Sequence, residues 1–204
     1  MVKGEFASMR LIHQIVPSFV PKPIAWGTTS ADPDRHFILF TFHDLQPEGS
    51  LPPPDRVAFA AAQLHQLSHL HLHSDNAAPR LGKFGFHITT YNGTLKQDNT
   101  WTDTWEEFYT RGMVRMLQLE EESHNSGPSG GSGACQELRQ VAKPFLEKVI
   151  PRLLRPLETN GRSIQPVLLH GDLWIGNVAA RKDTGEVIMF DASAFWGHNE
   201  CTLA

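Results

Sequence analysis

The segment from His170 to Asn177 (HGDLWIGN) combines residue types that can do chemistry on an oxygen atom. Asp172 follows an apolar run on a glycine turn, Asn177 lies five residues later, and Asp191 ends a further apolar run after a short hairpin. One carboxylate can orient a hydroxyl group and accept its proton, while an amide oxygen and a second carboxylate are hard ligands for Mg²⁺ on nucleotide phosphates. The pattern predicts phosphoryl transfer; the simpler interpretation is a turn with capping Asp and Asn residues.

The hydrophobic periodicity predicts the elements that must position these side chains. Helices are expected at residues 1–16, 55–71, about 105–117, with Thr102 or Asp103 as the cap, and 136–157, where three interior prolines should break the helix. Strands are expected at residues 24–28, 37–42, 167–169, 175–180 and 187–190. Helices and strands come in blocks, which is typical of an α+β fold.

Three segments carry more specific expectations. The continuous apolar run at 37–40 predicts a strand that is covered on both faces. Residues 43–54, which end in three consecutive prolines, should form a stiff connection, and the glycine- and serine-rich residues 125–134 should form a flexible insert.

The composition limits the classes of partner. Eighteen basic and 22 acidic residues give a formal charge of −4, which disfavours nonspecific nucleic-acid binding. Two cysteines, Cys135 and Cys201, are too few for a secreted disulfide framework and favour a reducing compartment. Neither a signal peptide nor an apolar run long enough to cross a membrane is recognisable, so we expect a cytoplasmic protein without membrane contact.

Several separated motifs together resemble the fructosamine kinase family, which includes ketosamine-3-kinases and protein-ribulosamine 3-kinases and is a branch of the aminoglycoside-phosphotransferase-like kinases. The motifs are GEF with Met9, VPKP at 20–23, LHQLS at 64–68, FGF at 84–86, NGT at 92–94, QDNTW at 97–101, WEEF at 105–108, HGDLW through Asn177, Asp191, and GHNE at 197–200. The resemblance implies a two-lobed protein-kinase-like fold. Residues 1–42 would be a partial N-lobe, 43–54 the hinge and 55–204 a partial C-lobe.

The resemblance also implies an activity: ATP-dependent phosphorylation of the 3-hydroxyl of a ketosamine, carried by a glycated protein lysine or a small adduct, which leads to deglycation. Asp172 would be the catalytic base, and Asn177 and Asp191 would bind Mg²⁺. Glu5 would be the helix glutamate that pairs with a phosphate-binding lysine. Trp174 would offer an aromatic face to the sugar or, in the simpler interpretation, fill the core beneath the loop.

The chain departs from the family pattern at both ends. The glycine-rich loop and the strand lysine of the family lie upstream of the Glu5 position, and Lys3, two residues from Glu5 on the same helix, cannot replace that lysine. Further helices of the family follow its G-H-x-E motif. We therefore expect weak turnover and an exposed apolar surface, and a catalytically impaired fragment or pseudokinase-like binding module is the alternative. A zinc site formed by His65, His69 and His73 is disfavoured, because no Glu or Cys accompanies them.

Overall fold

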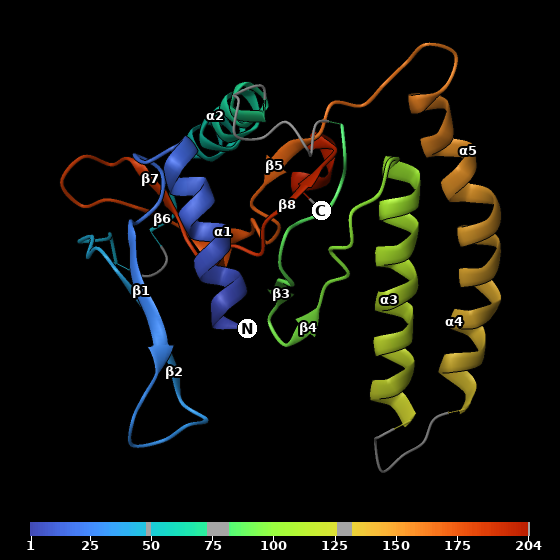
Figure 1. The fold of residues 1–204 in the computed structure, drawn as a ribbon, viewed down its shortest axis with the longest axis horizontal. Coiled ribbons are helices and arrows are strands. Elements are labelled where there is room, and N and C mark those ends of the chain that lie inside the picture. The colour runs from blue at the N-terminus through green and yellow to red at the C-terminus, as the bar shows by residue number, and fades with distance from the viewer. Residues whose placement is uncertain (48–49, 73–81, 126–131, 204) are drawn as a thin grey trace.

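The computed structural model describes residues 1–47, 50–72, 82–125 and 132–203. In Figure 1, two helices and several short strands form one side of the molecule, and a long helical hairpin forms the other. The helices are α1 (Val2–Ile15), α2 (Pro54–Leu72), α3 (Trp105–Asn125), α4 (Ser132–Pro144) and α5 (Ile150–Leu154). The strands are β1 (Pro23–Thr28), β2 (His36–Phe40), β3 (Tyr91–Asn92), β4 (Leu95–Lys96), β5 (Val167–Leu169), β6 (Val178–Ala180), β7 (Val187–Met189) and β8 (Phe195–Gly197).

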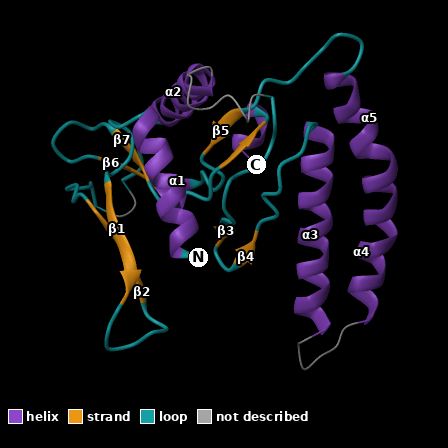
Figure 2. Ribbon diagram, in the orientation of Figure 1, coloured by secondary structure: helices purple, strands orange, loops and turns teal. Residues whose placement is uncertain are grey.

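The strands pair antiparallel in twos: β1 with β2, β3 with β4, β5 with β8, and β6 with β7. Figure 2 shows these short pairs distributed among the helices and loops. Isolated β-bridges connect two of these strand pairs to other segments of the chain. Leu45 pairs with Arg181 beside the β6–β7 hairpin, and Gly85 pairs with Trp196 of β8. These bridges attach the 43–47 segment and the loop before β3 to the strands that carry the motif residues.

The core lies where α1 and α2 pack against the β5–β8 pair. Met9, Ile12, Leu64, Leu168 and Leu169 are buried in it. Their apolar side chains leave water on folding, which is the main favourable contribution to stability.

Two buried serines complete the hydrogen bonding of this core. The Ser68 hydroxyl of α2 accepts a hydrogen bond from the backbone N–H of Leu168 at 2.9 Å. The Ser8 hydroxyl of α1 accepts one from the backbone N–H of Ala194 at 3.0 Å. Both helices are therefore fixed to the site strands by polar contacts as well as by packing.

Much of the predicted element pattern is confirmed. α1, α2, β5 and β7 lie within two residues of their expected bounds. The proline-rich stretch is broken into α4, a π-helical segment Phe145–Val149, α5 and a 3-10 segment Arg155–Glu158. The mixture of helices and strands agrees with the expected α+β class.

Two expectations about strands are wrong. The outer face of β2 is exposed, with 45% of Phe37 and 51% of Leu39 accessible, because α1 covers only the other face of the β1–β2 hairpin. Residues Ile175–Asn177 form a 3-10 turn rather than the start of a strand. This turn carries the chain from the Asp172 loop into β6.

Two expectations about helices are also wrong. Neither Thr102 nor Asp103 caps α3. The Thr104 hydroxyl accepts a hydrogen bond from Glu107 N at 3.2 Å, and the Glu158 carboxylate accepts one from Trp105 N at 2.9 Å. α4 begins at Ser132, inside the expected flexible insert, and residues 126–131 of that insert lie outside the described residues.

Candidate active site

The site begins two residues after the end of β5, at Gly171. Its φ of +83° favours glycine, and a Cβ atom there would lie 2.1 Å from the backbone oxygen of Ser193. The backbone N–H of Ser193 donates a hydrogen bond to the oxygen of His170 at 3.0 Å. The loop that carries Asp172 therefore packs backbone against backbone on the loop that carries Asp191.

Asn177 connects these two loops. Its Nδ2 donates hydrogen bonds to the backbone oxygen of Asp172 at 2.8 Å and to Asp172 Oδ2 at 2.9 Å, and lies 3.5 Å from the backbone oxygen of Asp191. The backbone oxygen of Asn177 also accepts a hydrogen bond from Phe190 N at 3.1 Å. With Nδ2 directed at Asp172, Oδ1 receives no hydrogen bond from the described part of the chain and remains available as a ligand.

The carboxylates of this region influence one another. Burial raises the pKa of Asp172, the hydrogen bond from Asn177 lowers it, and the negative charge of Asp191 raises it further. Burial first, and then the charge of Asp191, raise the pKa of Glu5 to about 7. The charge of Asp191 thus acts on both Glu5 of α1 and Asp172.

Among the described residues, no Lys or Arg forms an ion pair with Glu5, Asp172 or Asp191, and Lys3 makes none with Glu5. Negative charge of this kind is stabilised by a bound cation. The hard oxygen donors of Asn177 and Asp191 fit Mg²⁺, which prefers carboxylate and amide oxygens.

Asp191 has an unusual backbone conformation. Its φ is +58°, in the left-handed region, and it lies directly after Phe190, where β7 has ended. Non-glycine residues rarely adopt this region, although Asp and Asn tolerate it better than most. The backbone therefore turns sharply at the residue whose charge acts on Glu5 and Asp172.

Trp174 is an exposed residue, not a core tryptophan. Its side chain is 58% accessible, and a Cβ atom at Gly176 would lie 2.3 Å from its Cζ2. The indole ring thus lies directly on the glycine of the IGN turn, and a side chain at 176 would displace it. The structure excludes the interpretation of Trp174 as a residue buried beneath the loop.

Asp172 and Trp174 line a cavity of about 390 Å³. α3 forms the opposite wall, with aromatic and methionine side chains, and the segment 97–99 forms one side. The α3 residues that line it are Trp105, Phe108, Tyr109, Gly112, Met113 and Met116. A mostly apolar cavity with a few convergent polar groups is typical of a small-molecule site.

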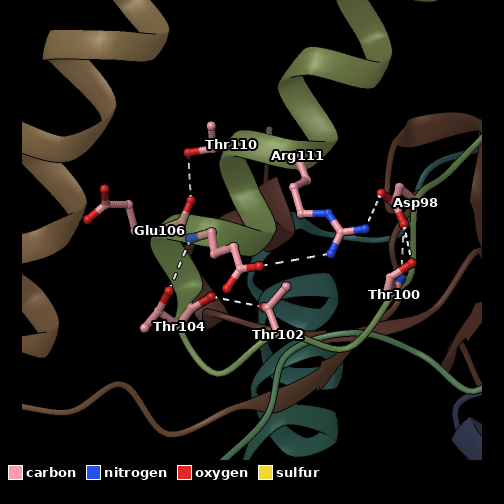
Figure 3. Close-up of polar contacts among 8 residues, drawn as sticks. Asp98, Thr100, Thr102, Thr104, Glu106, Thr110 and Arg111 are labelled. Atoms are coloured by element: carbon pink, nitrogen blue, oxygen red, sulfur yellow. Dashed lines mark hydrogen bonds and ion pairs between the residues drawn. The ribbon is translucent and has the colours of Figure 1, made fainter.

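Three polar contacts fix the α3 wall. Figure 3 shows Arg111 of α3 reaching Asp98, with 2.9 Å between the guanidinium nitrogen and the carboxylate. The Asp98 carboxylate also accepts hydrogen bonds from Thr100, and this interaction with Thr100 and Arg111 lowers the pKa of Asp98 against the effect of burial. At the start of the helix, Arg155 pairs with Glu106 at 2.7 Å, beside the cap that Glu158 provides.

Sequence reasoning missed the residues that connect the Asp191 loop to β3. The Ser193 hydroxyl donates a hydrogen bond to Asn92 Oδ1, and the same oxygen accepts one from Gln97 Nε2 at 3.0 Å. These partners lie 101 residues apart in the chain. No local pattern could have predicted this contact.

The described residues contain no group of three or more His, Cys, Asp or Glu side chains arranged around a metal. Metal binding near Asp172 would therefore depend on the amide of Asn177. His65 Nε2 shares a hydrogen bond with the Thr202 hydroxyl at 2.8 Å, and His73 lies outside the described residues. No helix among the described residues is both long enough and apolar enough to cross a membrane.

Comparisons with known proteins agree with this geometry. The ketosamine-3-kinase of Mus musculus is 32% identical over all of this chain and 64% of its own length. The chloroplastic protein-ribulosamine 3-kinase of Arabidopsis thaliana is 36% identical over 98% of the chain and 52% of its own length. The chain thus spans about half to two thirds of the length of these curated relatives.

Solved structures show the same fold. A candidate fructosamine-3-kinase from Haemophilus somnus superimposes with a TM-score of 0.67 at 20% identity, over 100% of this chain and 57% of the other. The aminoglycoside phosphotransferase APH(4)-Ia gives a TM-score of 0.51 at 13% identity, over 96% and 58%. These similarities establish a protein-kinase-like fold. The family model described as fructosamine kinase matches residues 1–204, and with the Asp172, Asn177 and Asp191 loops brought together, the chain belongs to the fructosamine kinase family.

Proposed function

We propose that the protein is an ATP- and Mg²⁺-dependent kinase that phosphorylates the 3-hydroxyl of ketosamines, and so acts in protein deglycation. The observation that carries this proposal is the Asn177 side chain, which binds the Asp172 loop beside an apolar cavity and leaves its own Oδ1 available. The names of the curated relatives support the substrate class, with ketosamine in the mouse protein and ribulosamine in the plant protein.

Asp172 is the proposed catalytic base. The amide nitrogen of Asn177 donates a hydrogen bond to Asp172 Oδ2 at 2.9 Å. Asp172 Oδ1 is left to accept the proton of a hydroxyl group bound in the cavity. The raised pKa of Asp172 makes the carboxylate a better proton acceptor than a solvated aspartate. A positioned base of this kind contributes typically about 10²- to 10⁴-fold to the rate.

Asn177 and Asp191 are the proposed Mg²⁺ ligands. When bound, Mg·ATP supplies the phosphoryl group and the positive charge that stabilises its transfer. The chain's own contribution is to hold the amide oxygen of Asn177 and the carboxylate of Asp191 on two loops that cannot move apart without breaking the contact between Gly171 and Ser193.

Trp174 and Glu5 complete the proposed site. The exposed indole of Trp174 offers a flat apolar surface that suits the C–H face of a ketose, next to the proposed base. Glu5 is the proposed partner of a phosphate-binding lysine. Its pKa of about 7 reflects a carboxyl group that is half-buried near Asp191, where a cation would restore its ionised form.

The lobe assignment is also a proposal. We assign residues 1–42 to a partial N-lobe, 43–54 to the hinge and 55–204 to a partial C-lobe. The hydrogen bond from Gln46 N to the oxygen of Ala180, at 2.8 Å, supports this assignment because it places the linker beside the β6–β7 hairpin. The free thiol of Cys201 supports a reducing compartment, for which we propose the cytoplasm, whereas the Arabidopsis relative is named as chloroplastic. The proposed partners are glycated protein lysines or small ketosamines.

A binding module that recognises ketosamines without phosphorylating them is the second candidate. It is favoured because no Lys or Arg side chain among the described residues forms an ion pair with Glu5, and phosphoryl transfer depends on positioned positive charge. Calorimetry separates the two candidates. Binding of a ribulose–lysine adduct without phosphate transfer from Mg·ATP supports the binding module.

The kinase proposal is tested by transfer of labelled γ-phosphate from Mg·ATP to a ribulose–lysine adduct. Asp172→Asn should lower the rate by at least about 100-fold because the base is removed. Asp183→Asn, which makes the same chemical change on the exposed β6–β7 hairpin, should leave the rate unchanged. An Asp172→Asn protein that transfers phosphate as fast as the parent would show that the base is assigned wrongly.

A further inference from the structure

Gly112 stands inside α3, where glycine is unfavourable. A glycine loses more backbone freedom in a helix than any other residue, and only proline is a worse helix former. Gly112 does not need a left-handed backbone, because its φ is not among the positive values of the described residues. Nor does it allow a close approach, because a Cβ atom there would meet no atom within 4 Å. Neither backbone geometry nor packing explains this glycine.

The position of Gly112 on the helix supplies an explanation. The residues four before, three before, one after and four after it are Phe108, Tyr109, Met113 and Met116, and all of them line the cavity that holds Asp172. Residues three and four apart share one helix face. Gly112 is therefore at the centre of the cavity wall, and a side chain there would occupy the cavity.

We propose that Gly112 sets the width of the acceptor cavity, and that the space it leaves receives the hydrocarbon arm of the amine in a lysine-derived ketosamine. This inference rests on the proposed function. The polar groups Asp172, Asn92 and Gln97 suit the sugar hydroxyls, whereas the wall next to Gly112 is built from Phe108 and methionine side chains. Methionine adapts its shape to apolar ligands, so this wall fits a flexible methylene chain.

The proposal predicts that stability and binding change in opposite directions. Gly112→Ala should raise the melting temperature by about 2 °C, because alanine is the better helix former and the added methyl group meets no obstacle. The same methyl group narrows the cavity and should weaken binding of a ribulose adduct of Nα-acetyl-lysine. Gly112→Leu should weaken it further, by at least about 10-fold, as expected when apolar bulk replaces ligand volume.

The experiment compares two adducts by calorimetry without ATP: ribulose on Nα-acetyl-lysine and ribulose on glycinamide, which lacks the long arm. Gly112→Leu should weaken the lysine adduct by at least about 10-fold and the glycinamide adduct by less than about 3-fold. Ser123→Ala is the matched control, since Ser123 is an exposed α3 residue away from the cavity. It should raise the melting temperature without changing either affinity.

The outcomes separate the inference from the proposed function. If the unmodified chain binds neither adduct, the ketosamine assignment fails, and the inference fails with it. If the unmodified chain binds both and Gly112→Leu binds the lysine adduct equally well, only the inference is overturned. If Gly112→Leu loses affinity equally for the two adducts, the assignment of the hydrocarbon arm to this wall is overturned. Should Gly112→Leu fail to fold, the opposite changes expected for Gly112→Ala decide the question.

Discussion

The β5–β8 and β1–β2 pairs are both two-stranded and antiparallel, yet they are stabilised in different ways. Every residue of β5 and β8 is buried, and α2 packs against β5. The β1–β2 hairpin is longer but is covered by α1 on one face only. Short strands thus hold the Asp172 loop because the tertiary core surrounds them, while the longer hairpin depends more on its own pairing.

The β1–β2 hairpin exposes four large apolar side chains. They are Ile24, Trp26, Phe37 and Leu39, with accessibilities from 41% to 54%. The strand register places Trp26 with Ile38 on one face of the hairpin and Phe37 with Gly27 on the other. Exposed apolar side chains favour association between molecules. The contrast with the buried β5–β8 pair gives four predictions.

The largest effect should come from a matched pair of leucine substitutions. Leu169→Ala should lower the free energy of unfolding by about 2–5 kcal/mol, because Leu169 in β5 is fully buried and its removal leaves a cavity. Leu39→Ala in β2 should cost less than about 1 kcal/mol, since half of its side chain is already in water. Urea unfolding measures both. Equal losses would show that the two strand pairs do not differ as described.

The second prediction concerns His170, which follows β5 and is fully buried. Burial lowers the pKa of His170 to about 4, and the backbone of Phe190 and Asp172 offsets part of that effect. The unfolded chain therefore binds a proton near pH 6.5, while the native protein does not until about pH 4. Stability should fall as the pH decreases through this window, by about 3 kcal/mol in total from this residue.

Urea unfolding between pH 7 and pH 4 tests this prediction against His170→Gln. The variant should be less stable at pH 7, but its further loss on acidification should be smaller than that of the parent. This comparison removes the contributions of the other titrating groups, which both proteins share. Parallel pH profiles would show that His170 is protonated equally in the folded and unfolded states.

The third prediction removes a buried acceptor. Ser68→Ala leaves the backbone N–H of Leu168 without its partner at 2.9 Å and should cost about 1–3 kcal/mol. Ser18→Ala, at an exposed position, should cost less than about 0.5 kcal/mol. Thermal unfolding of the two variants measures the difference. A loss for Ser68→Ala as small as that for Ser18→Ala would mean that water replaces the serine.

The smallest effect on stability is expected at the hairpin surface. Trp26→Thr should change the free energy of unfolding by no more than about 0.5 kcal/mol, because threonine favours strands and the site is solvent-accessible. The same change should reduce self-association, which sedimentation velocity measures at rising protein concentration. Strong destabilisation of the isolated monomer would place Trp26 in the folded core instead.

The sequence predicted local features well. The helical spacing of residues 1–16 and the three prolines after Gln136 were sufficient, because periodicity and proline geometry act within one element. β8 escaped prediction because its three residues are defined by pairing with β5, far away in the chain. The burial of β2 was predicted wrongly because an apolar run does not reveal whether a second layer covers it.

The candidate site shows the same division. The types and spacing of Asp172, Asn177 and Asp191 were sufficient to propose the chemistry, and the structure brings them together. For α3, the hydrophobic periodicity predicted only a helix at about 105–117. Its role as a cavity wall depends on Asp98 and Glu158, which fix the helix from separate segments.

The left-handed backbone at Asp191 makes this position intolerant of a change that conserves charge. Glutamate would keep the negative charge, but it has a longer arm and is less suited to a φ of +58° than the aspartate it replaces. Asparagine would tolerate the same backbone conformation while removing the charge of the proposed Mg²⁺ ligand. Protein engineers who wish to test the proposed metal ligand without disturbing the backbone at this position should therefore choose asparagine, since glutamate alters both side-chain length and backbone fit.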